Sequence, residues 1–69
     1  MIKYNFKQVV KAKGLSARQL AALAGISPNT AALLVKAETH KDYNVSTEVL
    51  DRLCGALGVQ LAQLIRYKK

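Results

Sequence analysis

The chain has 69 residues and a net charge of +7 at pH 7, and 51% of its residues are hydrophobic. It is too short for two domains of ordinary size, and no apolar run approaches the roughly 18 residues of a membrane span. We therefore expect a single domain over residues 1–69. The one cysteine, Cys54, cannot form an internal disulfide, so we expect the protein to work in the reducing cytoplasm.

The two ends of the chain have similar patterns. Met1–Tyr4 and Ile65–Lys68 each alternate apolar and polar residues, which predicts a short two-stranded β-ribbon between the termini. The first predicted helix covers Asn5–Lys13, with Asn5 as its N-cap, and Gly14 supplies a C-terminal stop. The helical part of the chain therefore begins directly after the first strand.

A second helix is predicted from Ser16, because Ser16 and Gln19 match a capping box in which each side chain pairs with the other's free backbone N–H. Gly25 ends this helix, and only residues 25–27 separate it from the next one. So short a connection forces a sharp angle between two helices. Ala21 leaves room for their close approach, Gly25 can adopt the left-handed conformation that the turn needs, and Ile26 fills the corner.

The third predicted helix starts with Ser27 followed by Pro28 and continues to Lys36. Proline is well placed at the first helical position, because the N–H that it lacks would have no partner there. Leu34 is expected to point back into the core. The stretch Ala37–Val45 is polar and is predicted to be a loop.

The last two predicted helices complete an all-α chain. One starts near Ser46 and ends at Gly58, and Cys54 has the helical spacing of a core residue within it. A short fifth helix covers Leu61–Ile65, with Gln60 as a poor N-cap, so we expect it to fray. Leu and Ala dominate the apolar residues, and both favour helices.

Positive charge is concentrated in the first half of the chain. Six basic residues and no acidic residue lie between Met1 and Ala37, whereas all four acidic residues lie between positions 38 and 51. This distribution favours a polyanionic partner, either nucleic acid or an anionic membrane surface. The chain lacks a nucleophile paired with a base, a converging carboxylate pair and a phosphate-binding glycine loop, so we do not expect an enzyme. We also expect neither a cofactor nor a metal, since no Cys/His cluster has ligand spacing.

The chain resembles the phage-repressor-like helix-turn-helix family, also called the XRE or Cro/repressor type, over the stretch GLSARQLAALAGISPNTAALL. The order Gly-Leu-Ser, Gln-Leu-Ala, Ala-Gly-Ile-Ser and a polar helix start carries the resemblance, and VLDRLCGALGV is similar to the family's fourth helix. The resemblance covers about residues 5–65. It implies a compact five-helix, lambda-repressor-like domain with its helix-turn-helix at the second and third helices.

The same resemblance implies a DNA-binding transcriptional regulator, expected to be a repressor. Its third helix, about residues 28–36, would enter the major groove, with Asn29 able to pair with adenine and Thr30 to reach a phosphate or a thymine methyl. Phosphate contacts are expected at the start of the second helix and in the loop after the third. The predicted DNA-binding residues are Arg18, Gln19, Ser27, Pro28, Asn29, Thr30, Ala32, Leu33, Lys36, His40, Lys41 and Asn44.

Several residues depart from the family pattern. Ala32 and Leu33 stand where polar base readers are usual. Val35 stands where a charged residue is common, and Ala17 stands where Gln is common. Few groups therefore remain for hydrogen-bond readout. We expect either modest specificity with affinity drawn from phosphates, or recognition by methyl contacts and DNA shape.

Two other functions stay open at this point. One is a protein-interaction module on the same fold, such as an antitoxin or a phage accessory factor, which would bind its partner through Leu33 and Val35. The other is a non-specific architectural DNA binder. A regulator would be a homodimer on half-sites about 34 Å apart, and we expect its contact in the fifth helix and the ribbon, through Leu64, Ile65 and Tyr67.

Overall fold

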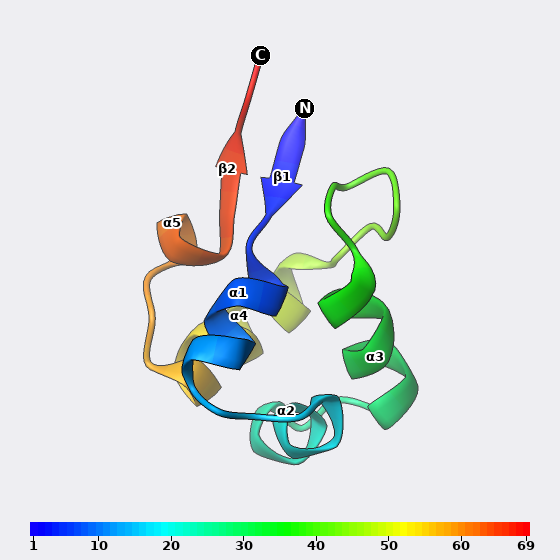
Figure 1. Cartoon of the computed structure of the whole chain (residues 1–69), viewed down its shortest axis with the longest axis vertical. Helices are drawn as coiled ribbons and strands as arrows, with labels where there is room; N and C mark the ends of the chain where they lie inside the picture. Colours follow the sequence, from blue (N-terminus) through cyan, green and yellow to red (C-terminus); the bar gives the residue numbers. More distant parts are fainter.

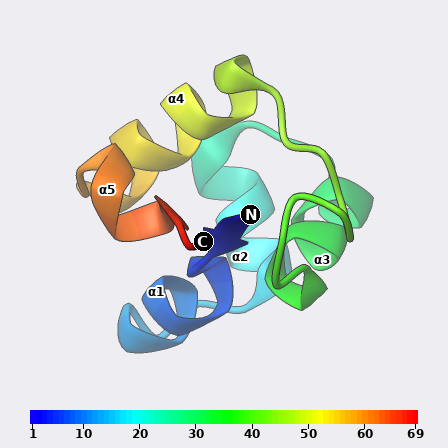
Figure 2. The same ribbon diagram turned by 90° about the horizontal axis from the view of Figure 1, so that it is seen from above.

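The computed structural model describes all 69 residues. Its elements are β1 (Ile2–Tyr4), α1 (Phe6–Ala12), α2 (Ala17–Ala24), α3 (Pro28–Lys36), α4 (Thr47–Leu57), α5 (Leu61–Leu64) and β2 (Ile65–Tyr67). The two strands form a ribbon that projects from one end of the molecule, and α2 lies at the opposite end (Figure 1). Seen from above, α1, α3, α4 and α5 surround the base of the ribbon (Figure 2). The predicted five-helix fold with a terminal ribbon is confirmed.

Side-chain caps fix the starts of the three longest helices. Ser16 Oγ accepts a hydrogen bond from Gln19 N at 3.2 Å, and Gln19 Oε1 accepts one from Ser16 N at 2.9 Å, so the predicted capping box is present. The hydroxyl of Ser27 caps α3, and that of Ser46 caps α4. These bonds satisfy N–H groups that a helix start otherwise leaves without partners.

The start of α1 differs from the prediction. Asn5 stands at the N-cap position, but its side chain makes no capping hydrogen bond. Its backbone N–H instead donates to Leu64 O at 2.7 Å, so the end of α5 holds the start of α1. Ile65, which the sequence placed in both the fifth helix and the ribbon, belongs to β2.

The core lies where the five helices meet and consists of 12 buried residues, all hydrophobic. Its largest fully buried side chains are those of Phe6, Leu20, Leu34, Leu53 and Leu64. Ala21 and Ala31 are also buried, on α2 and α3 respectively, and small residues allow close approach of two helices. The predicted inward direction of Leu34 is therefore confirmed.

The ribbon is tied to the rest of the molecule along one edge. β1 pairs with β2 in antiparallel register, with Lys3 opposite Arg66. The other edge of β1 pairs with the segment after α3, because Tyr4 N donates to Glu38 O at 2.8 Å and His40 N donates to Ile2 O at 3.1 Å. The predicted polar loop thus begins as a short extension of the ribbon, which anchors the C-terminal end of α3.

Candidate nucleic-acid interface

A tight turn joins α2 to α3. Gly25 adopts a left-handed conformation with φ of +68°, which favours glycine because other side chains are strained there. Ile26 N donates to Ala21 O at 3.1 Å, and the half-buried Ile26 side chain packs against the core. Two separate helices with a sharp bend between them are therefore present, as the sequence predicted.

Arg52 of α4 supports this turn from behind. Its Nη1 donates to Gly25 O at 3.3 Å, and its Nη2 lies 3.3 Å from the Glu48 carboxylate. No sequence pattern indicates this contact, because Arg52 and Gly25 are 27 residues apart. The guanidinium satisfies a carbonyl at the bend and links α4 to the helix-turn-helix.

One side of α3 faces away from the core. Ala31 and Leu34 are buried, whereas Asn29, Leu33 and Lys36 are exposed at helical spacing. Leu33 is 42% exposed and places an apolar group on this face of the helix. An amide, an apolar group and a cation therefore follow one another along the protruding face of α3.

The other predicted DNA-binding residues at the start of α3 and within it are mostly less exposed or already hydrogen-bonded. Ser27 Oγ accepts from Thr30 N at 3.1 Å and donates to Thr30 Oγ1 at 2.8 Å, so both hydroxyls take part in the helix cap. Pro28 is exposed, whereas Thr30 and Ala32 are only partly exposed.

Val35 does not share a surface with Leu33. It is half-buried and packs against the core, and two residues along a helix point in nearly opposite directions. The sequence-based expectation that Leu33 and Val35 form one apolar contact surface is therefore not supported by their placement.

Arg18 and Gln19 are exposed in the first turn of α2. The Gln19 side-chain oxygen is used in the capping box, which leaves its amide NH₂ group free to donate. Arg18 has no carboxylate partner within 4.0 Å, since the only ion pair in the structure joins Arg52 and Glu48. Both side chains can therefore donate to an anion beside the start of α2.

The loop after α3 is organised by Asp42. Its Oδ2 accepts from Glu38 N at 2.9 Å and from Thr39 N at 3.1 Å, and these hydrogen bonds hold the pKa of Asp42 below its ordinary value. Lys41 and Asn44 are exposed on this loop, whereas His40 is half-buried against β1. The loop is thus a defined structure next to the C-terminal end of α3.

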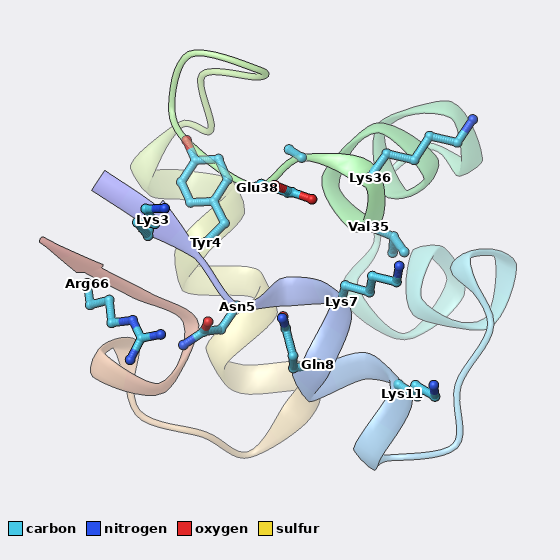
Figure 3. Close-up of a pocket in the computed structure, with 11 residues that line it drawn as sticks. Lys3, Tyr4, Asn5, Lys7, Gln8, Lys11, Val35, Lys36, Glu38 and Arg66 are labelled. Atoms are coloured by element: carbon cyan, nitrogen blue, oxygen red, sulfur yellow. The ribbon is translucent and has the colours of Figure 1, made fainter. Parts of the chain in front are cut away.

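The largest hollow on the surface, about 640 Å³, lies outside most of the predicted site. It is enclosed by β1, α1, the end of α3 and β2 (Figure 3). Its basic lining residues are Lys3, Lys7, Lys11, Lys36 and Arg66, of which only Lys36 was predicted to contact DNA. The spacing of Lys3, Lys7 and Lys11 at every fourth position was visible in the sequence, but Arg66 joins them only through the pairing of the strands. We call these five side chains and the hollow between them the basic groove.

The structure contains no group of three or more His, Cys, Asp or Glu side chains that could hold a metal ion. None of its helices has the length and apolar character needed to cross a bilayer. The chemistry that the surface offers is that of cations, amides and hydroxyls aimed at solvent. Such groups recognise anions and base edges.

The two helices, the tight left-handed turn and the protruding face of α3 define a helix-turn-helix protein. The family model of the Cro/C1-type HTH DNA-binding domain matches residues 5–69, and the chain belongs to this family. The family that the sequence suggested is therefore confirmed, and DNA is its class of partner. No curated protein and no solved structure matches the chain closely enough to show a relationship.

Proposed function

We propose that this protein is a sequence-selective transcriptional regulator that inserts α3 into the major groove of DNA. The observation that carries the proposal is the protruding face of α3, where Asn29, Leu33 and Lys36 are exposed on the helix that follows the turn. In helix-turn-helix proteins the N-terminal residues of this helix face base edges. The proposed output is repression, because occupancy of an operator by itself excludes other proteins from it.

Base recognition falls to few side chains. Asn29 has the amide geometry that pairs with N6 and N7 of adenine, and the methyl groups of Ala32 and Leu33 suit the methyl group of thymine. Ser27 and Thr30 contribute their backbone groups. They also contribute their hydroxyls, which already take part in the cap of α3. An A·T-rich half-site with little hydrogen-bond readout follows from this composition.

Phosphate contacts flank the reading helix. Arg18 and Gln19 donate at the start of α2, and Lys36, Lys41 and Asn44 donate at and after the end of α3. These groups position the protein and supply affinity without carrying sequence information. His40 contributes least, since it is half-buried against β1.

A homodimer would combine two such contacts on adjacent half-sites, and the outer edge of β2 offers a place for it. Met1 and Lys68 exchange backbone hydrogen bonds of 2.7 and 2.8 Å, so the alternation along an antiparallel strand turns the N–H and C=O of Tyr67 outward. The Tyr67 side chain is 71% exposed. Leu64, which the sequence assigned to this contact, is fully buried and is excluded from it.

The experiment that tests the function is selection of bound sequences from a random duplex library. We expect enrichment of an A·T-rich half-site, repeated at about 10–10.5 base pairs or a multiple of that distance if the protein is a dimer. The same selection with Asn29→Ala should relax the preference at one adenine. Binding to duplex DNA without enrichment of any sequence would contradict selective binding and favour an architectural role.

The proposed location is the cytoplasm, because the protein needs access to DNA. The reducing environment there keeps Cys54 a free thiol.

A further inference from the structure

The basic groove gathers cations from elements that are far apart in the sequence. Lys3 comes from β1, Lys7 and Lys11 from α1, and Arg66 from β2. Lys36, on the last turn of α3, completes the lining. In Figure 3 the side chain of Lys36 extends away from Lys3 and Arg66, so it stands at the border between the basic groove and the exposed face of α3.

None of these five cations has an acidic partner. The only ion pair in the structure joins Arg52 and Glu48, and the one carboxylate that lines the basic groove, Glu38, makes no contact within 4.0 Å with any of them. Lys7 and Lys11 are also one helical turn apart, a like-charge arrangement that destabilises a helix. Lys11 and Lys36 do lie in the last turns of α1 and α3, where a cation is favoured, but no carboxylate neutralises any of the five charges. The unneutralised cluster points to an anionic ligand.

The layout of the cations favours a polymer over a small anion. Lys7 and Lys11 are about 6 Å apart along the axis of α1, and Lys3 and Arg66 extend the row beyond the start of that helix. A single phosphate group meets donors that converge on one point. A nucleic-acid backbone instead presents a regular series of phosphates, and a row of separate cations matches that series.

We propose that the basic groove binds the sugar–phosphate backbone of the same duplex that α3 reads, beyond the major-groove contact. The proposal rests on the proposed function, because it assumes that α3 engages DNA. Continuity supports it: α3 runs from α2 toward the ribbon, its last turn borders the basic groove at Lys36, and α1 packs against α3 (Figure 1). A duplex held by the face of α3 therefore meets the basic groove at the C-terminal end of the same helix.

The test compares two double variants with the same change in net charge. Lys7→Gln/Lys11→Gln removes two cations of the basic groove, and Lys68→Gln/Lys69→Gln removes two exposed cations of the C-terminal tail that do not line it. Affinity for a duplex obtained by library selection is measured over a series of salt concentrations. We expect the slope of log affinity against log salt to become less steep by about 1.8 for the first variant, because each lost phosphate contact changes it by about 0.9. The tail variant should change the slope by less than half as much.

Footprinting provides a second readout. Hydroxyl-radical protection by the unsubstituted protein should extend past the half-site on one side, and this extra protection should disappear in Lys7→Gln/Lys11→Gln but not in the tail variant. A lowered melting temperature of Lys7→Gln/Lys11→Gln would indicate a structural role and would count against the proposal. We expect little change in the melting temperature, because removal of the like-charge pair and loss of the cation in the last turn of α1 act in opposite directions.

The remaining outcomes separate the two proposals. If the unsubstituted protein binds no duplex, the proposed function fails and the basic groove proposal fails with it. If it binds DNA but the two double variants have the same slope and footprint, only the basic groove proposal is overturned. Binding of inorganic tripolyphosphate that depends on Lys7 and Lys11, without any effect of these residues on DNA, would assign the basic groove to a small polyphosphate and would also overturn it.

Discussion

Gly25 and Arg52 together determine the bend between α2 and α3, and this bend leaves one face of α3 exposed to solvent. Gly25 takes a φ of +68°, and a Cβ atom at this position would lie 3.0 Å from Arg52 Nη1. The strain of a side chain in the left-handed region and the approach to Arg52 therefore act on the same residue. Because Arg52 is anchored on α4, a change at Gly25 also affects how α4 supports the helix-turn-helix.

Gly25→Ala should lower the free energy of unfolding by about 1–2 kcal/mol, the usual penalty for a left-handed alanine. The matched control is Gly55→Ala, since Gly55 lies within α4 and a Cβ atom added there would meet no other atom within 4 Å. That substitution should raise stability by about 0.5–1 kcal/mol. Urea unfolding of both variants measures the difference, and two shifts of the same sign would contradict the role assigned to Gly25.

Leu33→Asp distinguishes a DNA reader from a protein-interaction module. A carboxylate at this position would replace an apolar contact in the major groove with a negative charge among base acceptors and flanking phosphates, so we expect affinity for DNA to fall at least tenfold. The smaller Leu33→Ala change should reduce affinity much less, because it removes only apolar contact. Both are measured on the selected duplex by fluorescence anisotropy. Unchanged DNA affinity in Leu33→Asp would remove Leu33 from the DNA interface, and loss of binding to a protein partner in the same variant would favour the protein-interaction module.

At the scale of elements, the segment after α3 depends on a single carboxylate. Asp42 accepts hydrogen bonds from the backbone N–H groups of Glu38 and Thr39, and Thr39 forms a bridge with Lys3 of β1. The exposed residues Lys41 and Asn44 are presented by the loop that these bonds define. The position of two proposed phosphate contacts is thus set by a residue that has no direct role in binding.

The lowered pKa of Asp42 gives this loop a pH dependence. Its carboxylate stabilises the folded state above the unfolded pKa, near 3.8, and this contribution is lost as the pH falls through the lower folded-state pKa. Asp42→Ala should therefore be less stable than the unsubstituted protein at pH 6. The difference between their urea midpoints should shrink as the pH is lowered below about 4. A difference that stays constant from pH 6 to pH 2.5 would show that the hydrogen bonds of the ionised carboxylate do not stabilise the loop.

At the scale of the whole molecule, the pairing of the two chain ends has two consequences. It brings Lys3 next to Arg66, which completes the basic groove, and it leaves the outer edge of β2 open. An open strand edge with an exposed aromatic side chain is a ready partner for a second copy. The proposed phosphate contacts of the basic groove and the proposed dimer contact thus both involve the same short ribbon.

Tyr67→Pro tests the proposed dimer contact. Proline removes the outward N–H of β2. The hydrogen bonds between Met1 and Lys68 and those between Lys3 and Arg66 keep all their donors. We expect sedimentation equilibrium to show a shift from dimer to monomer with the helical content of the circular dichroism spectrum preserved. A variant that remains as dimeric as the unsubstituted protein would place the contact elsewhere.

The local sequence determined the helix-turn-helix. Hydroxyl caps at Ser16, Ser27 and Ser46 and the left-handed Gly25 and Gly58 depend on neighbours within a few residues. The starts of α2, α3 and α4 and the ends of α2 and α4 therefore follow from the chain itself. The family and the class of partner followed from the same stretch, and the structure and the family match confirmed both.

Only the tertiary structure decided which side chains meet. The backbone of Asn5 is held by Leu64, Val35 is turned toward the core, and Arg52 reaches Gly25, although nothing in the neighbourhood of these residues indicates it. The basic groove likewise requires strands from opposite ends of the chain to pair. The physical reason is that capping and turn energies act between near neighbours in the chain, whereas burial and charge clustering depend on distances that exist only after the helices have packed.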